Sequence, residues 1–274
     1  WSPERRLAQD LEDDLRRLAS APDVRHVAVM PDIHRGKSMP NGVVLATRHL
    51  LYPEAVGADM GCGVLAARLE LDRAAFADVR VAQRVLEEMV RAVPVLKRTR
   101  HHAVVAYPAE LSSSPLGVAA LEKEKQRGGL LQLGTLGRGN HFVELQAEAT
   151  GETWIMIHTG SRGIGQAIFA RHAAAAQGEH QGLFYLDAET PAGSAYLADV
   201  DWATRYASAN RRAILAACDG VLPELLGRGA DAASVLDAPH NFLRAERHFG
   251  EDVWVHRKSA LSAALGEESL VPGS

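Results

Sequence analysis

Two periods of apolar positions alternate along the chain. Leucines at three- and four-residue spacing predict an amphipathic helix over Ser2–Ser20, with Ser2 as the N-cap and Pro3 in the first turn. Runs rich in β-branched residues predict buried strands, and these runs are Val24–Pro31, Gly42–Ala46, Val64–Leu71, Thr153–Gly160 and Glu251–Ala260. The helical period returns in Arg73–Val93, Ile164–Ala176 and Ala195–Leu226, the last with a break expected near Asp219 and Gly220.

This mixture of elements predicts an α+β fold, in which mixed β-sheets supply loops to one site and helices pack around them. No repeat, low-complexity tract or clear linker divides the sequence, so we expect a single domain over residues 1–274. Residues 101–117 show no period and are expected to form a loop. Because the sequence opens on Trp1 and stops at "LVPGS", we expect a chain that is truncated at its C-terminus.

Composition narrows the class of protein. The formal net charge of −4 argues against a surface that binds nucleic acid everywhere, although a local basic channel is compatible with it. Two cysteines, Cys62 and Cys218, are too few for a disulfide framework. No apolar run approaches the ~20 residues that cross a bilayer. The sequence therefore predicts a cytoplasmic protein without membrane contact.

Residues that bind metals collect in the expected loops. Asp59 and Cys62 share the stretch "GADMGCG", whose glycines allow a tight turn that lets both side chains face one ion. Thiolate together with carboxylate suits manganese, zinc, iron or cobalt. Three histidines occur in similar settings, at the end of a strand or after a glycine-rich stretch, and they are His141, His158 and His240. Five such donors exceed one tetrahedral site and predict two adjacent ions that share the sulfur.

The remaining histidines carry less information. Seven of them lie in helix-like or polar surroundings and are expected at the surface: His26, His49, His101, His102, His172, His180 and His248. The sequence does not decide between a structural and a functional role for His34 and His256, which lie inside motif-like stretches.

The stretch "HTGSRGIGQAI" allows a different interpretation, because it is similar to the nucleotide-binding turn of short-chain dehydrogenases. Its glycine spacing is one residue short, and no tyrosine is followed four positions later by lysine. The dehydrogenase hypothesis is therefore weak. The backbone amides of residues 160–165, with Arg162 beside them, still predict a cradle for a phosphate group.

Seven motifs between Val24 and Ser274 resemble, in order, those of the RtcB family of RNA-splicing ligases. They are "PDIHRGK", "AVGADMGCG", "LGTLGRGNHFVE", "IHTGSRGIG", "PHNF", "HRK" and "LVPGS". The resemblance implies a ligase that uses GTP and manganese to join an RNA 2′,3′-cyclic phosphate or 3′-phosphate end to a 5′-hydroxyl end. It further implies a guanylylated histidine and an RNA-guanylate intermediate.

The same resemblance implies roles for individual residues. Cys62 would bridge two manganese ions, with Asp59 and His141 completing one site and His158 and His240 the other. Positions that match nucleotide-binding residues are Asn140, His141, Glu144 and Ser274. Positions that match catalytic residues are Asp32, Cys62 and Arg162.

The sequence also departs from the family pattern. The guanylate-accepting histidine of the family lies in an "HGAGR"-like motif beyond the "PGS" segment, and no residue here matches it. The chain by itself is therefore expected not to complete ligation, whereas the full-length protein is. Two alternatives stay open: a catalytically silent relative that binds metal or RNA, and a metal-dependent phosphoesterase that acts on RNA ends. The sequence does not indicate the physiological RNA, the oligomeric state or the need for an activating protein factor.

Overall fold

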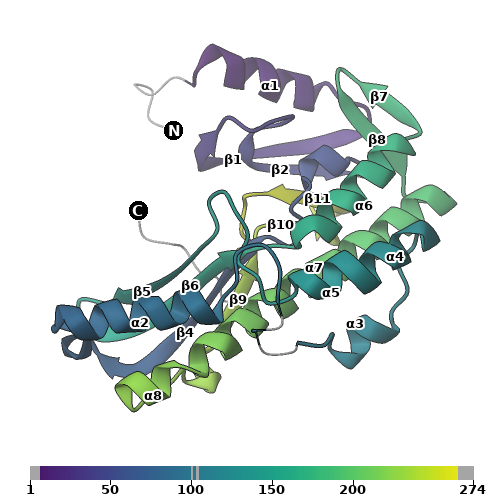
Figure 1. The fold of residues 1–274 in the computed structure, drawn as a ribbon. Helices are drawn as coiled ribbons and strands as arrows, with labels where there is room; N and C mark the ends of the chain where they lie inside the picture. Colours follow the sequence, from purple (N-terminus) through teal and green to yellow (C-terminus); the bar gives the residue numbers. More distant parts are fainter. Residues whose placement is uncertain (1–6, 100, 103–104, 265–274) are drawn as a thin grey trace.

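The computed structural model describes residues 7–99, 101–102 and 105–264, which form two four-stranded sheets, a small third sheet and surrounding helices (Figure 1). The α+β fold class is therefore confirmed. Every strand pairing within the described ranges is antiparallel, whereas we expected mixed sheets. A dehydrogenase nucleotide-binding unit needs parallel strands joined by a crossover helix, so this topology also argues against that alternative.

The first sheet has the strand order β1-β2-β11-β10. Its strands are β1 (Val24–His34), β2 (Asn41–Thr47), β11 (Glu251–Lys258) and β10 (Asn241–His248). Helix α1 (Gln9–Ala19) covers one face, where Leu18, Val43 and Leu45 are fully buried in a shared core. The helix begins at Gln9 after an extended Ala8, so the expected helix over Ser2–Ser20 was wrong at residues 7 and 8. The predicted N-cap Ser2 and first-turn Pro3 lie outside the described residues.

The second sheet has the strand order β5-β6-β4-β9. Its strands are β5 (Phe142–Ala147), β6 (Glu152–Thr159), β4 (Gly63–Asp72) and β9 (Leu236–Pro239). Apolar side chains of one face, such as Leu65 and Ile155, form a core with Val85 of α2 (Val79–Ala92). The small sheet consists of β3 (Leu50–Leu51), β8 (Leu183–Asp187) and β7 (Gly178–His180).

Helix α2 begins later than the sequence predicts. Asp78 accepts a hydrogen bond from the backbone N–H of Arg80 at 2.8 Å and is the N-cap, so the preceding Arg73–Phe76 is a separate 3-10 turn. Aspartate competes with the helical backbone for hydrogen bonds and favours the cap over the interior. The predicted start of this helix at Arg73 was therefore wrong.

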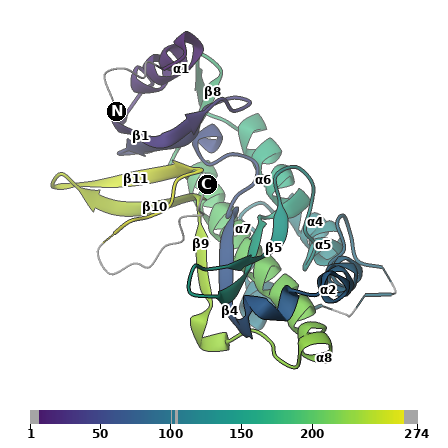
Figure 2. The same cartoon turned by 90° about the vertical axis from the view of Figure 1, so that its left-hand side faces the viewer.

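The long helix α7 (Pro191–Asp219) runs past both large sheets and contacts β4, β6, β9 and β10 (Figures 1 and 2). It ends at Gly220, so the predicted break is confirmed, and α8 (Leu222–Leu226) follows. Helix α6 (Arg162–Ala174) packs against it.

The shorter helical segments are α3 (Ala109–Ser113), which lies in the expected loop, α4 (Glu122–Glu124), a π-helical turn (Lys125–Gly129) and α5 (Leu130–Gln132). None of the described helices combines the length and apolar character needed to cross a bilayer.

His172 corrects one expectation, because it is buried rather than at the surface. Its side chain is 2% exposed, and Nε2 lies 2.7 Å from Oδ2 of the fully buried Asp199. Asp199 also accepts from the backbone N–H of Gly117 at 2.5 Å. The pair therefore ties α6 to α7 and to the 116–118 segment, a tertiary contact that the local pattern around His172 does not reveal.

His256 proves to be a core residue. Its Nε2 accepts from the backbone N–H of Tyr52 at 3.0 Å, and its Nδ1 donates to the carbonyl oxygen of Leu45 at 3.2 Å. Both bonds suit a neutral imidazole. Burial lowers its pKa to about 4, although the bond to Leu45 opposes this change.

Because the pKa of buried His256 is lowered, we expect the protein to lose stability in acid. Between pH 6.5 and 4 the unfolded chain binds a proton that folded His256 does not, so its contribution is complete above pH 6.5 and falls as the pH drops toward 4. When the pH is lowered from 7.5 to 5, the free energy of unfolding is expected to fall in both the wild type and the variant His256→Gln. We expect the fall to be ~2 kcal/mol larger in the wild type. Urea unfolding at the two pH values measures this difference, and equal losses would contradict it.

Candidate metal centre

The loop that precedes β4 presents Asp59 and Cys62 on one side. The backbone N–H of Cys62 donates to the carbonyl oxygen of Asp59 at 3.1 Å, which closes a tight turn. Gly61 adopts a φ of 68°, and a Cβ there would lie 2.6 Å from the Cα of Thr204 in α7. Only glycine therefore allows the loop to pack this closely against the helix.

Strand pairing brings the three histidines to this loop. His158 is near the end of β6 and pairs with Val64, two residues after Cys62. His141 directly precedes Phe142, which pairs with His158 from the other side. His240 lies between β9 and β10, and its backbone N–H donates to the carbonyl oxygen of Cys62 at 2.8 Å.

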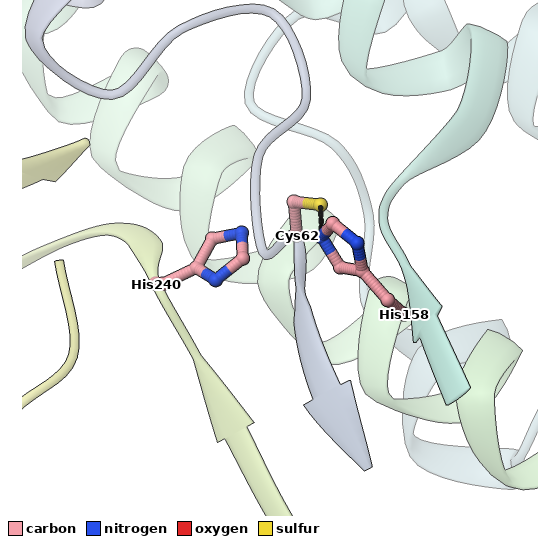
Figure 3. Close-up of side chains that lie close together, drawn as sticks. All are labelled: Cys62, His158 and His240. Atoms are coloured by element: carbon pink, nitrogen blue, oxygen red, sulfur yellow. Dashed lines mark hydrogen bonds between the residues drawn. The ribbon is translucent and has the colours of Figure 1, made fainter. Parts of the chain in front are cut away.

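The five side chains form two groups that share Cys62. One group is Cys62, His158 and His240, and the other is Asp59, Cys62 and His141; within each group the potential ligand atoms lie within 4.8 Å of one another. Figure 3 shows the Cys62 sulfur close to the His158 ring, with the His240 ring on its other side. The Sγ atom is 3.3 Å from His158 Nε2 and 3.6 Å from His141 Nε2. The predicted convergence of these residues is confirmed, and their role as ligands stays a prediction.

The hydrogen-bond partners of His141 favour a cation at this place. Its Nδ1 lies 2.9 Å from the carbonyl oxygen of Leu136, which only accepts, so Nδ1 carries a hydrogen. In a neutral ring Nε2 is then an acceptor, yet it lies 2.9 Å from Oδ2 of Asp59, another acceptor. Two acceptors this close need a positive charge between them, which a proton or a metal cation supplies.

His158 shows the same arrangement. Its Nδ1 donates to the carbonyl oxygen of Asn140 at 3.1 Å, so the lone pair of Nε2 faces the Cys62 sulfur. Backbone carbonyls that hold one ring nitrogen and aim the other are typical of metal-binding histidines. The donor set of one carboxylate, one sulfur and three imidazoles therefore fits a pair of divalent transition-metal ions.

Burial sets the protonation of the centre. It lowers the pKa of His240 to about 3 and also lowers that of His158, so both imidazoles are neutral at pH 7. Burial, together with the charge of Asp59, raises the pKa of the Cys62 thiol. Burial opposes ionisation of Asp59, but its hydrogen bond to His141 and the charge of that ring outweigh this effect and lower the pKa. Neutral imidazoles and an ionised carboxylate are the forms that bind metals.

Arg162 lies beside the centre at the first residue of α6. Its φ of 58° is left-handed, an unfavourable conformation for a residue with a side chain, and its Nε donates to Thr135 Oγ1 at 3.3 Å. The guanidinium lies against Gly137, where a Cβ would come within 2.2 Å of Nη1. The preceding Ser161 donates its backbone N–H to Asp59 at 3.1 Å. The helix start and its arginine thus adjoin the Asp59 group. Two of the backbone amides expected to cradle a phosphate already have protein partners, since Ser161 donates to Asp59 and Gly163 donates to Gln132 Oε1 at 2.9 Å.

Comparison with known proteins identifies the family. A sequence model described as tRNA-splicing ligase RtcB matches residues 14–274. The chain belongs to the RtcB family. RNA-splicing ligase RtcB1 of Escherichia coli is 33% identical over 300 residues, which cover 100% of this chain and 74% of the relative. RNA-splicing ligase RtcB of a second Escherichia coli strain is 32% identical with the same coverage. The tRNA-splicing ligase RtcB of Pyrobaculum aerophilum is 27% identical over 323 residues, covering 90% of this chain and 66% of the relative.

The other described residues that the RtcB resemblance singles out are not among the potential ligands of the two groups. Asp32 is exposed on β1 of the first sheet, and neither group of potential ligands includes it. Asn140 and Glu144 are exposed beside His141 and on β5, and the Glu144 carboxylate accepts from Gln146. Ser274 lies outside the described residues. Their predicted roles are not tested by these positions.

Two buried polar residues of α7 were missed by the sequence analysis. Asn210 is fully buried, and its Oδ1 accepts from the backbone N–H groups of Gly134 and Thr135 at 2.6 and 3.1 Å. Arg211, next to it, is 1% exposed. A signal was present, because both residues occur at helical spacing with the apolar Ala203, Ala207 and Ile214. Polar residues on the apolar face of a helix are expected to have specific partners.

Proposed function

We propose that this chain is the metal- and nucleotide-binding part of an RNA ligase. The ligase joins a 2′,3′-cyclic phosphate or 3′-phosphate end of RNA to a 5′-hydroxyl end with GTP as the energy source. The observation that carries the proposal is the pair of donor groups around Cys62, set beside Arg162 and the start of α6. The family assignment and the names of the relatives as RNA-splicing ligases support it.

In this proposal, Asp59, Cys62 and His141 hold one manganese ion, and Cys62, His158 and His240 hold a second. When bound, such ions neutralise phosphate oxygens and stabilise the charge that develops on them, a contribution of several kcal/mol. Three of the side chains that would bind them are in ligating forms: neutral imidazoles at His158 and His240 and a carboxylate at Asp59. Cys62, whose thiol pKa is raised by burial, would lose its proton on binding the metal. These forms support the assignment of a divalent metal site.

The remaining residues bind and orient the reacting groups. Arg162 is proposed to donate to the phosphate oxygens, since a guanidinium forms paired hydrogen bonds with them. Asn140 and Glu144 are proposed to contact the guanine nucleotide, with Ser274, and Asp32 is proposed to support the active site. Both Cys62 and Cys218 are free thiols, which suits the reducing cytoplasm where we propose that the ligase acts.

Ligation of defined RNA ends tests this function. Because no residue of this chain matches the guanylate-accepting histidine, the test uses the full-length protein. With GTP and Mn²⁺ we expect it to join a 3′-phosphate RNA to a 5′-hydroxyl RNA, and we expect no product when either GTP or metal is left out. Intact mass after incubation with GTP and Mn²⁺ is expected to show a guanylate adduct. Removal of end phosphates without GTP would instead indicate a phosphoesterase. Metal binding without adduct or product would indicate a catalytically silent relative, and either outcome would overturn the proposal.

A further inference from the structure

The guanidinium of Arg211 is buried beneath the metal centre and makes three hydrogen bonds to three separate segments. Nη1 donates to the carbonyl oxygen of Gly61 at 2.7 Å and to that of Thr159 at 2.9 Å. Nε donates to Oδ1 of Asp237 at 2.6 Å. Arg211 is 1% exposed and Asp237 has a side chain that is 8% exposed, so this is a buried ion pair.

Each of the three segments carries one member of the Cys62, His158 and His240 group. Gly61 immediately precedes Cys62, and Thr159 immediately follows His158. Asp237 lies on β9, three residues before His240, and its Oδ2 accepts from Ser208 of α7 at 2.5 Å. A single side chain of α7 thus connects the three segments that carry the potential ligands, two through backbone carbonyls and one through the Asp237 carboxylate.

We propose that Arg211 is a positioning residue of the metal centre. It fixes the positions of the segments that carry Cys62, His158 and His240 relative to one another. This inference rests on the proposed function, because it assigns Arg211 a role toward the metal pair of that site. Its hydrogen bonds reach the neighbours of the potential ligands, so it acts through the backbone carbonyls of Gly61 and Thr159 and through the carboxylate of Asp237.

The chemistry of the guanidinium explains why arginine occupies this place. Its planar fork directs several N–H groups in fixed directions, whereas a lysine ammonium is a single point charge on a flexible stem. Lysine therefore preserves the charge opposite Asp237 but cannot hold all three partners in the same geometry. Loss of a partner that orients ligands typically costs 10- to 100-fold in metal affinity.

Substitution of Arg211 by lysine tests the proposal. We expect Arg211→Lys to bind Mn²⁺ about 10- to 100-fold more weakly than the wild type in calorimetric titrations of the metal alone. With Co²⁺ as a spectroscopic probe, we expect a weaker or shifted sulfur-to-metal absorption band. The matched control is Arg205→Lys, on the same helix, where the arginine is 40% exposed and pairs with Asp201 at 2.8 Å. That control is expected to bind both metals like the wild type.

A second variant separates positioning from folding. Removal of one partner of a buried ion pair can unfold a protein, whereas replacement of both by apolar residues is often neutral for stability. The double variant Arg211→Met/Asp237→Leu leaves no unpaired buried charge and is therefore expected to unfold cooperatively. Its midpoint is expected to lie below that of the wild type, because the carbonyls of Gly61 and Thr159 and the Ser208 hydroxyl lose their partners. We expect it still to bind Mn²⁺ at least about 10-fold more weakly.

The outcomes distinguish this inference from the function on which it rests. Mn²⁺ affinity and Co²⁺ absorption that match the wild type, in either folded variant, would overturn the positioning role alone. Failure of the wild type to bind Mn²⁺ would overturn the metal centre, and the inference with it. Weakened binding in the Arg211 variants, with unchanged binding in Arg205→Lys, is the result that we expect.

Discussion

Replacement of Cys62 by alanine is expected to remove at least one of the two manganese ions and to lower ligation at least about 100-fold. The reason is that both donor groups include this sulfur, so its loss takes a ligand from each proposed site. Changes in residues that only orient ligands already cost 10- to 100-fold, and loss of a shared ligand is expected to exceed that. Equilibrium dialysis followed by elemental analysis gives the number of bound ions, and a ligation assay gives the activity.

The second cysteine supplies the control for this variant. Cys218 is fully buried in the core between the second sheet and α2, α7 and α8, away from the donor groups. Cys218→Ala therefore removes a buried thiol of the same size without touching the centre, and its cost is expected to be limited to ~1 kcal/mol of stability. An unchanged number of bound ions in Cys62→Ala would refute the bridging role of the sulfur.

Gly61→Ala is expected to lower the free energy of unfolding by about 2–5 kcal/mol and to weaken metal binding as well. Two costs add here. The φ of 68° costs about 1–2 kcal/mol for a residue with a Cβ, and overpacking against α7 costs about 1–3 kcal/mol. The new Cβ would meet the Cα of Thr204 at 2.6 Å and the Cβ of Ala207 at 2.8 Å, so the loop must move away from the helix and carry Cys62 with it.

Gly227 supplies the matched control, because substitution there carries only the first of these costs. It adopts a φ of 74° at the end of α8, and a Cβ there would meet nothing within 4 Å. Gly227→Ala is therefore expected to lose only the conformational ~1–2 kcal/mol and to bind metal normally. Urea unfolding of both variants, with and without Mn²⁺, measures the difference. Equal losses in the two variants would show that contact with α7 does not hold the Cys62 loop in place.

Elements were predictable where neighbouring residues in the sequence all favour the same secondary structure. The β-branched runs that became β2, β4 and β6 alternate or remain apolar over most of their length, which suits burial inside a sheet. Element ends were less predictable, because a single cap decides them. With Asp78 as its N-cap, α2 starts at Val79, six residues later than the apolar period indicates.

The sequence misled where a residue is stabilised by a distant partner. His172 lies in a helix next to Arg171, which is typical of a surface position, yet Asp199 from another helix pairs with it in the core. Arg211 is likewise an arginine in the middle of a helix, and its three partners come from segments 26 to 150 positions away. Charged groups can be buried only with such partners, and the local pattern of a helix does not contain them.

By itself, the sequence determined the kinds of atoms available for chemistry: one carboxylate, one thiol and three imidazoles in glycine-rich loops or at strand ends, within motifs of one family. Only the tertiary structure decided that these atoms meet and that Cys62 belongs to both groups. The physical reason is that the ligand types are properties of single residues. Their distances depend on antiparallel register between strands far apart in the chain, and on one buried helix against which the loops pack.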